Sequence, residues 1–293
     1  MGTVVDVVGS GPATDTLLAT LDDLDVRIDH QEAPTVDSAD FAVVVDVTGA
    51  ATFETASEQA LDGGTPWIAV EIGGIGGQPT VPASIAGFDP DRECYDCLRG
   101  RVEANTTAAA DGVDEPGPAT RRVAGAVAGE AVADYLADEP GAAGSSVLGH
   151  VVELPRQKRR FFPLPGCSCG GERDTTIDRA HAAVDIEQAL ERAEQALDDR
   201  VGIVQQVGEA ESFPAPYYLA QLTDTSGFSA VTAPRQAAGV AADWDGAFMK
   251  ALGESYERYA AGVYTAAETT TATAASLDDA VAPEAFVAPD DAD

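Results

Sequence analysis

Short apolar runs that alternate with helical segments are the feature that most constrains the fold of this chain. Residues 3–21 combine a buried strand, a glycine turn and a helix, and residues 25–29 and 41–49 add two strands. A helical segment at 52–62 then precedes another apolar run at 66–74. Strands that alternate with helices form a mostly parallel sheet with helices packed on its faces. The sequence therefore predicts an α/β fold whose first part is a Rossmann-like parallel sheet.

The same pattern continues to about residue 170. We predict a helix over residues 119–137, which ends before Pro140, and a later strand within 146–155. These elements extend the α/β pattern, so residues 1–170 are predicted to form the first domain.

A different pattern follows. Residues 185–199 are predicted to form an amphipathic helix, and another helix begins near Asp243. Three strands are predicted between them, at 201–207, 217–223 and 228–234. The segment 171–264 is therefore predicted to be a second domain of the α+β type. Residues 265–293, which are rich in Thr, Ala and Asp, are predicted to be a loose acidic tail.

Acidic residues dominate the charged composition. The 293 residues include 50 Asp and Glu against 17 Lys and Arg, which gives a formal net charge of −33. Such a surface stays hydrated in concentrated salt, so the composition predicts a cytoplasmic protein of a halophile. It argues against nucleic-acid binding, because the basic run RQKRR at 156–160 is short and is predicted to be a solvated or locally paired loop. No uninterrupted apolar run reaches about eighteen residues, so we predict no membrane span.

Four cysteines fall in two close pairs. Cys94 and Cys97 form a C-x-x-C turn, and Cys167 and Cys169 form a C-x-C turn that two glycines follow. A reducing cytoplasm disfavours disulfides, and two such turns can complete a tetrahedral site of four thiolates. We therefore predict a structural Zn²⁺ site, because four thiolates leave no open coordination position for catalysis. Two unrelated dithiols, redox-active or inert, are the alternative.

The first strand-to-helix turn, GSGPAT, has glycines at positions 9 and 11. A dinucleotide-binding fingerprint would have a third glycine where this chain has Thr14, and Asp29 stands about where a ribose-binding acid is expected. The partial match favours a tight turn without a ligand, with nucleotide contact as the alternative.

A helical segment at 247–264 carries two acids three residues apart. Lys250, Glu254, Glu257 and Arg258 share one face of this helix, because residues three and four apart are neighbours. Two carboxylates on one face can hold Mg²⁺ and thereby a triphosphate, and the two cations could bind phosphate oxygens. The same residues could instead form i,i+4 salt bridges, Lys250 with Glu254 and Glu254 with Arg258, on a solvated face.

The segment KALGESYERYAAG at 250–262 resembles the A-x-x-E-x-x-E-R helix of YcaO proteins. The two cysteine pairs resemble those of the zinc-bearing, ubiquitin-activating-enzyme-like cyclodehydratase partner, which many of these systems carry fused in front of YcaO. The resemblance covers nearly the whole chain, with the partner domain at 1–170 and the N-terminal part of a YcaO domain at 171–264.

This resemblance implies ATP-dependent modification of peptide backbone amides. In the family, a side chain or an external sulfide attacks the carbonyl, ATP phosphorylates the amide oxygen, and an azoline or a thioamide results. The resemblance implies that Glu254 and Glu257 bind Mg²⁺ and that Arg258 is either a phosphate contact or a structural contact. Lys250 departs from the family, which often has a small or hydroxyl residue there, and is a candidate ATP contact from its place on the helix.

The resemblance also implies partners. The first domain would recruit the leader of a precursor peptide, and we further expect a dehydrogenase partner and a homodimer as candidate assemblies. YcaO domains continue beyond this helix, so a truncated chain with an incomplete ATP site is implied as well. Two other functions stay open: a non-catalytic leader-peptide-binding adaptor that acts with a separate catalytic chain, and a nucleotide-dependent oxidoreductase that uses the GSGPAT turn.

Overall fold

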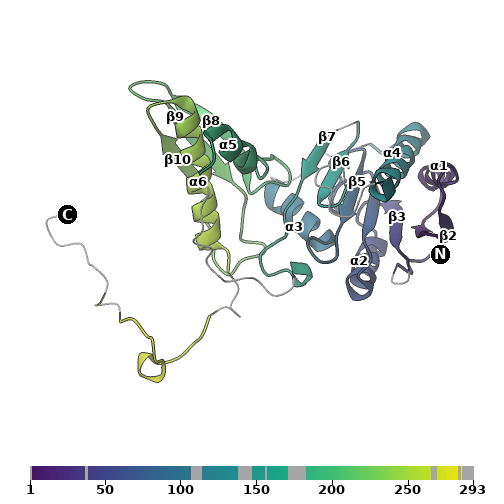
Figure 1. Cartoon of the computed structure of the whole chain (residues 1–293), viewed down its shortest axis with the longest axis horizontal. Helices are drawn as coiled ribbons and strands as arrows, with labels where there is room; N and C mark the ends of the chain where they lie inside the picture. Colours follow the sequence, from purple (N-terminus) through teal and green to yellow (C-terminus); the bar gives the residue numbers. More distant parts are fainter. Residues whose placement is uncertain are drawn as a thin grey trace.

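Two β-sheets organise the part of the chain that the computed structural model describes, which comprises residues 2–36, 39–106, 114–137, 147–155, 157–170, 183–264, 269–282 and 285. Figure 1 shows two lobes, each with helices packed on its own sheet. The first lobe, up to residue 170, contains β1 (Val4–Val8), α1 (Pro12–Leu21), β2 (Arg27–Gln31), β3 (Phe41–Val47), α2 (Ala51–Gly63), β4 (Trp67–Ile72), β5 (Ala83–Phe88), α3 (Tyr95–Asn105), α4 (Pro118–Ala137), β6 (His150–Glu153), β7 (Gln157–Arg160) and the short 3₁₀ helix η1 (Ser168–Gly170). The second lobe, residues 183–264, contains α5 (Ile186–Glu194), β8 (Val204–Glu211), β9 (Tyr217–Leu222), β10 (Gln236–Val240) and α6 (Trp244–Gly262).

The first lobe has a seven-stranded sheet in the order β2-β1-β3-β4-β5-β6-β7. The pairs β1–β2, β1–β3 and β3–β4 are parallel, as the alternation of strands and helices predicts. The pairs β4–β5, β5–β6 and β6–β7 are antiparallel, so the sheet is mixed and the prediction of a parallel sheet is right only for its first four strands. The cause is the turn after β4, where Gly73, Gly76 and Gly77 have positive φ and the chain reverses without a crossover helix.

Helices cover both faces of this sheet. α1 and α4 pack on one face and α2 and α3 on the other, and strand β3 shows the division, since Val43 and Val45 belong to the first core and Val44 to the second. Burial on both faces explains why the central strands β3 and β4 are nearly continuous apolar runs in the sequence. α4 approaches α1 closely because Gly125 has no side chain; a Cβ there would lie 2.0 Å from the carbonyl oxygen of Ala13.

The second lobe is a three-stranded antiparallel sheet in the order β10-β9-β8, with α5 and α6 packed against it. The strand predicted at 228–234 is wrong, because the third strand is β10, a few residues later. Phe228 and Ser229 donate backbone hydrogen bonds to the carbonyl of Thr225, which turns the chain before β10 begins. In β10, Gly239 lies against α6, and a Cβ there would be 2.1 Å from the carbonyl oxygen of Ala247.

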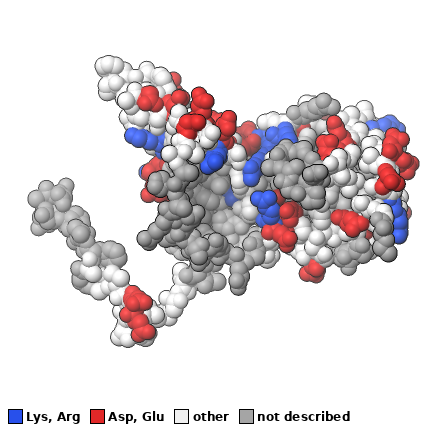
Figure 2. Space-filling view, in the orientation of Figure 1, with Lys and Arg blue, Asp and Glu red and all other residues white. Residues whose placement is uncertain are grey.

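A buried ionic cluster joins the two lobes. The side chain of Arg159 on β7, which is 4% exposed, lies 3.0 Å from Glu153 and 2.7 Å from Asp198, and Arg200 also contacts Glu153, at 2.5 Å. The run RQKRR was predicted to be a loop; its described residues form strand β7, and Arg159 points into this cluster. Figure 2 shows Lys and Arg side chains gathered near the boundary between the lobes, next to Asp and Glu.

The described part of the C-terminal segment extends away from both lobes (Figure 1). Residues 269–282 are exposed and contain one short 3₁₀ helix, η3 (Ala274–Ser276). The rest of the predicted tail at 265–293, apart from residue 285, lies outside the described residues. Among the helices that the structure describes, none has the length and apolar character that crossing a membrane requires.

Candidate functional site

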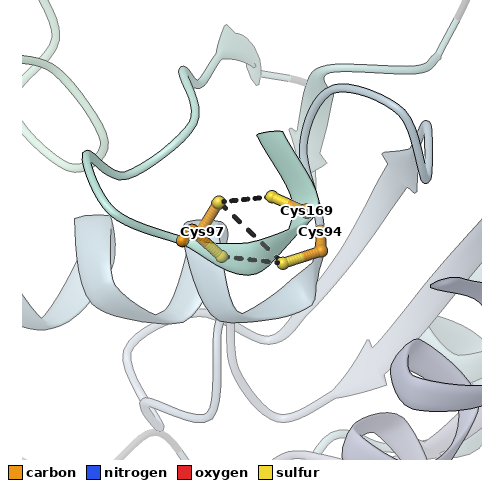
Figure 3. A group of neighbouring side chains, drawn as sticks. Cys94, Cys97 and Cys169 are labelled. Atoms are coloured by element: carbon orange, nitrogen blue, oxygen red, sulfur yellow. Dashed lines mark hydrogen bonds between the residues drawn. The ribbon is translucent and has the colours of Figure 1, made fainter. Parts of the chain in front are cut away.

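The four cysteines come together at one end of α3. Cys94 is the N-cap residue of this helix and Cys97 lies in its first turn, where its backbone N–H donates to the carbonyl of Cys94. Cys167 and Cys169 come from the turn that leads into η1 and from η1 itself. Figure 3 shows the side chains of Cys94, Cys97 and Cys169 directed toward one another.

The spacing of the sulfurs matches a tetrahedral metal site. Cys94 lies 3.5 Å from Cys167 and 3.9 Å from Cys97, Cys97 lies 3.4 Å from Cys169, and all four sulfurs lie within 4.8 Å of one another. A tetrahedron with Zn–S bonds of about 2.3 Å has S–S edges of about 3.8 Å. The cysteines are free, with all but Cys167 buried. These four residues would therefore hold Zn²⁺, although the metal itself stays a prediction.

Backbone groups support the sulfurs. The N–H of Leu164 donates to the sulfur of Cys97 at 3.2 Å, and the thiol of Cys169 contacts the carbonyl of Arg92 at 3.7 Å. The pKa of the Cys167 thiol lies below its ordinary value because the neighbouring thiol of Cys169 hydrogen-bonds to it. The pKa of the Cys97 thiol is raised by its thiol neighbours, of which Cys167 is the strongest.

Helix α6 places the predicted ATP-binding residues on its outer face. Asp243 caps this helix by accepting the N–H of Gly246 at 2.7 Å, which explains why the helix begins where the sequence predicts. Arg258 pairs with Glu254 at 2.6 Å, so one of the two anticipated i,i+4 salt bridges forms. Glu257 is exposed, and the described residues give it no ion pair.

The two cations of this face hold the edge of β10. Lys250 donates to the carbonyl of Val240 at 3.0 Å, and Arg258 donates to the carbonyl of Gln236 at 2.6 Å. The anticipated pair between Lys250 and Glu254 is therefore replaced by a contact with the edge strand. The roles of Glu254, Glu257, Arg258 and Lys250 toward Mg²⁺ and ATP stay predictions.

The GSGPAT turn lines a cavity of about 500 Å³ at the carboxyl ends of β1 and β3, together with Glu32, Asp46 and Arg121. Gly9 has a φ of 126°, and a Cβ there would lie 2.3 Å from the carbonyl oxygen of Val45. The close approach of these backbones is therefore sufficient to explain why position 9 is a glycine. Asp29 pairs with Arg27 at 2.5 Å and does not line the cavity. The geometry is that of a tight turn, which needs no nucleotide to explain it.

Two buried charged residues gave no signal in the sequence. Glu71, at the end of β4, accepts hydrogen bonds from the N–H groups of Gly76 and Gly77 and from the hydroxyl of Thr48, and burial raises its pKa. Arg101, on α3, is buried between the lobes. Each has partners that only the fold brings close, so residue spacing could not find them.

The sequence matches no protein-family model, and no curated protein matches it. Among solved structures, a heterocyclase in complex with substrate and cofactor matches 88% of this chain and 39% of its own length, with a TM-score of 0.61 and 15% identity. The heterocyclase TruD matches 69% of this chain and 33% of its own, with a TM-score of 0.48 and 17% identity. MccB of E. coli matches 62% of this chain and 68% of its own, with a TM-score of 0.41 and 13% identity. The first of these shows a shared fold across both lobes, and the chain spans about two fifths of that heterocyclase.

Proposed function

We propose that this chain belongs to an ATP-dependent enzyme that modifies peptide backbone amides, by azoline-forming cyclodehydration or by thioamidation. The observation that supports this proposal best is the fold, which follows that of a heterocyclase over 88% of the chain with a TM-score of 0.61. In this proposal, residues 1–170 form a ubiquitin-activating-enzyme-like domain that recruits a precursor peptide, and residues 171–264 form the N-terminal part of a YcaO domain.

The outer face of α6 has suitable groups for Mg²⁺ and a triphosphate. Oε1 of Glu254 accepts the hydrogen bond of Arg258, so its second oxygen and the exposed carboxylate of Glu257 are the candidate Mg²⁺ ligands. Arg258 would neutralise phosphate charge from the same turn, and Lys250 lies two turns earlier on the helix. ATP, when bound, would supply the phosphoryl group that activates the amide oxygen.

ATP binding at this face can be separated from a structural role. We expect Glu254→Gln and Glu257→Gln each to weaken Mg²⁺-dependent ATP binding at least about tenfold, measured by calorimetry in high salt. Both variants should unfold within about 1 kcal/mol of wild type, because the pair of Glu254 with Arg258 is partly exposed. Glu191→Gln on α5 is the matched control. Unchanged ATP binding in both α6 variants would remove these residues from the ATP site.

A non-catalytic peptide-binding adaptor is the second candidate. The observation that favours it is that Glu254, Arg258 and Lys250 all have partners within the chain, as residues that only stabilise the lobe would. An adaptor should bind a leader peptide without ATP turnover, and its affinity should be the same in the Glu254→Gln variant. ATP hydrolysis that rises when the peptide is added would exclude the adaptor.

A further inference from the structure

A buried arginine on α3 has no carboxylate partner among the described residues. Arg101 is 1% exposed; its Nε donates to the carbonyl of Phe162 at 3.1 Å and its Nη2 to the carbonyl of Pro163 at 2.8 Å. Its Nη1 has no hydrogen-bond partner among the described residues, and the hydroxyl of Tyr259 lies nearby. A buried cation without a counter-charge is strongly destabilising, and the chain has 50 acids from which a partner could have come. This position therefore requires an explanation.

The four-cysteine cluster lies next to Arg101 along the same helix. Cys97 and Arg101 are four residues apart on α3, so they share a helix face. Both hold the same stretch of chain, because Arg101 binds the carbonyl of Pro163 and the sulfur of Cys97 accepts the N–H of the following residue, Leu164. Four thiolates around one Zn²⁺ carry a net charge of about −2, which is the anion that Arg101 lacks.

The other side of the Arg101 guanidinium rests on the second lobe. Its central carbon lies 5.4 Å from the centre of the Tyr259 ring on α6 and 5.7 Å from that of Phe228, within the range of cation–π attraction. Tyr259 is buried, and it follows Arg258 directly in the sequence of α6. One side chain thus contacts the chain that holds the cysteine cluster and the helix that carries the predicted ATP-binding residues.

We propose that Arg101 is the counter-charge of a metal–tetrathiolate centre and that it transmits metal occupancy of this centre to the position of α6. The inference rests on the zinc part of the proposed function. When the metal is removed, the negatively charged metal–tetrathiolate centre is lost, and Arg101 is left as an uncompensated buried cation. Its contacts with Tyr259 and Phe228 then weaken, and the C-terminal half of α6 becomes less protected.

Two substitutions separate the charge of Arg101 from its shape. Arg101→Met keeps the length and removes the charge, so zinc affinity should fall about 10- to 100-fold, as outer-shell changes do at metal sites. Arg101→Lys keeps the charge but loses the planar stack, so zinc affinity should stay near that of wild type while α6 exchanges faster, whether zinc is present or absent. Arg99→Met, at an exposed position of the same helix, is the matched control and should change neither quantity.

Zinc affinity would be measured by competition with a chromogenic chelator, and α6 protection by amide hydrogen exchange with and without zinc. In wild type, chelation should raise the exchange of α6 peptides around Tyr259. If folded Arg101→Met binds zinc as tightly as wild type, Arg101 is not the counter-charge of the metal centre. If α6 exchange in wild type is unchanged after chelation, Arg101 does not transmit metal occupancy to α6. If Arg101→Met does not fold, the Arg101→Lys variant and the chelated wild type still test the proposal. The proposal predicts near-wild-type zinc affinity with faster α6 exchange in Arg101→Lys, and faster α6 exchange in chelated wild type; any other result contradicts it.

These measurements need neither ATP nor a peptide. A negative ATP-binding result would therefore count against the proposed enzyme and leave the Arg101 inference standing. Absence of zinc binding by wild type would overturn the Arg101 inference and the zinc site together, whatever the ATP result.

Discussion

The buried ionic cluster between the lobes gives a sharp prediction for Arg159→Met. Methionine keeps the buried stem of the side chain but removes the guanidinium that Glu153 and Asp198 share; these acids are 7% and 16% exposed. Breaking a buried pair by removing one partner costs about 3–5 kcal/mol. Asp199 is 75% exposed and returns to water at little cost.

The expected loss lies at the lower end of this range. Glu153 keeps its contact with Arg200 at 2.5 Å, and Asp198 keeps the backbone N–H groups of Arg200 and Val201 at 2.8 and 3.0 Å. We therefore expect the free energy of unfolding to fall by about 3 kcal/mol. The loss should persist in high salt, because buried pairs are screened much less than exposed ones.

Urea unfolding can measure this change by linear extrapolation, with the fluorescence of Trp67 in the first lobe and Trp244 in the second as probes. Arg27→Met is the matched control: Arg27 is 68% exposed and pairs with Asp29, so it should cost less than about 1 kcal/mol. A loss under about 1 kcal/mol for Arg159→Met, equal to that of the control, would refute the reasoning.

Three further predictions concern other parts of the structure. Gly125→Ala should lower the free energy of unfolding by about 1–3 kcal/mol, because the new methyl group would meet a backbone oxygen of α1. Gly253→Ala, which has open space around it, should raise the free energy of unfolding by up to about 1 kcal/mol. Thermal unfolding of the two variants would measure both changes. Cys97→Ser should abolish binding of about one zinc per chain, as metal analysis after dialysis would show. Glu71→Gln should lower the free energy of unfolding by about 1–3 kcal/mol, because the carboxylate accepts three hydrogen bonds that an amide cannot all accept. Burial raises the folded-state pKa of Glu71 above its ordinary 4.5. The stability that protonated Glu71 contributes to wild type is therefore lost as pH rises from 4.5 through that raised value. The difference in free energy of unfolding between wild type and Glu71→Gln should narrow over the same interval.

Each of these has a contrary outcome. Equal stability changes at the two glycines would mean that α4 can shift away from α1 freely. Full zinc content after Cys97→Ser would remove that sulfur from the metal site. If the difference in free energy of unfolding between wild type and Glu71→Gln widens as pH rises, the pKa of Glu71 is lowered in the folded state and the prediction is wrong.

The sequence by itself determined the features that depend on local pattern. Nearly continuous apolar runs predicted the parallel strands β1, β3 and β4, because strands that are buried on both faces need mostly apolar side chains. Asp243 marked the start of α6 as an N-cap. The cysteines could be assigned to one site despite the 69 residues between Cys97 and Cys167, because cysteine is the residue type that binds metal by thiolate and the chain has no other cysteines.

Tertiary structure alone decided the features that depend on distant partners. β5 and α3 carried no pattern that we could assign, and β10 was predicted a few residues too early, because turns and close backbone contacts set where those elements lie. The surroundings of charged residues were the hardest feature to predict from the sequence. Arg159 meets Asp198, 39 residues away, and Arg101 meets Tyr259 across the two lobes. Whether an arginine is solvated, paired or buried against a metal site depends on which groups the fold places around it, and periodicity along the chain does not contain that information.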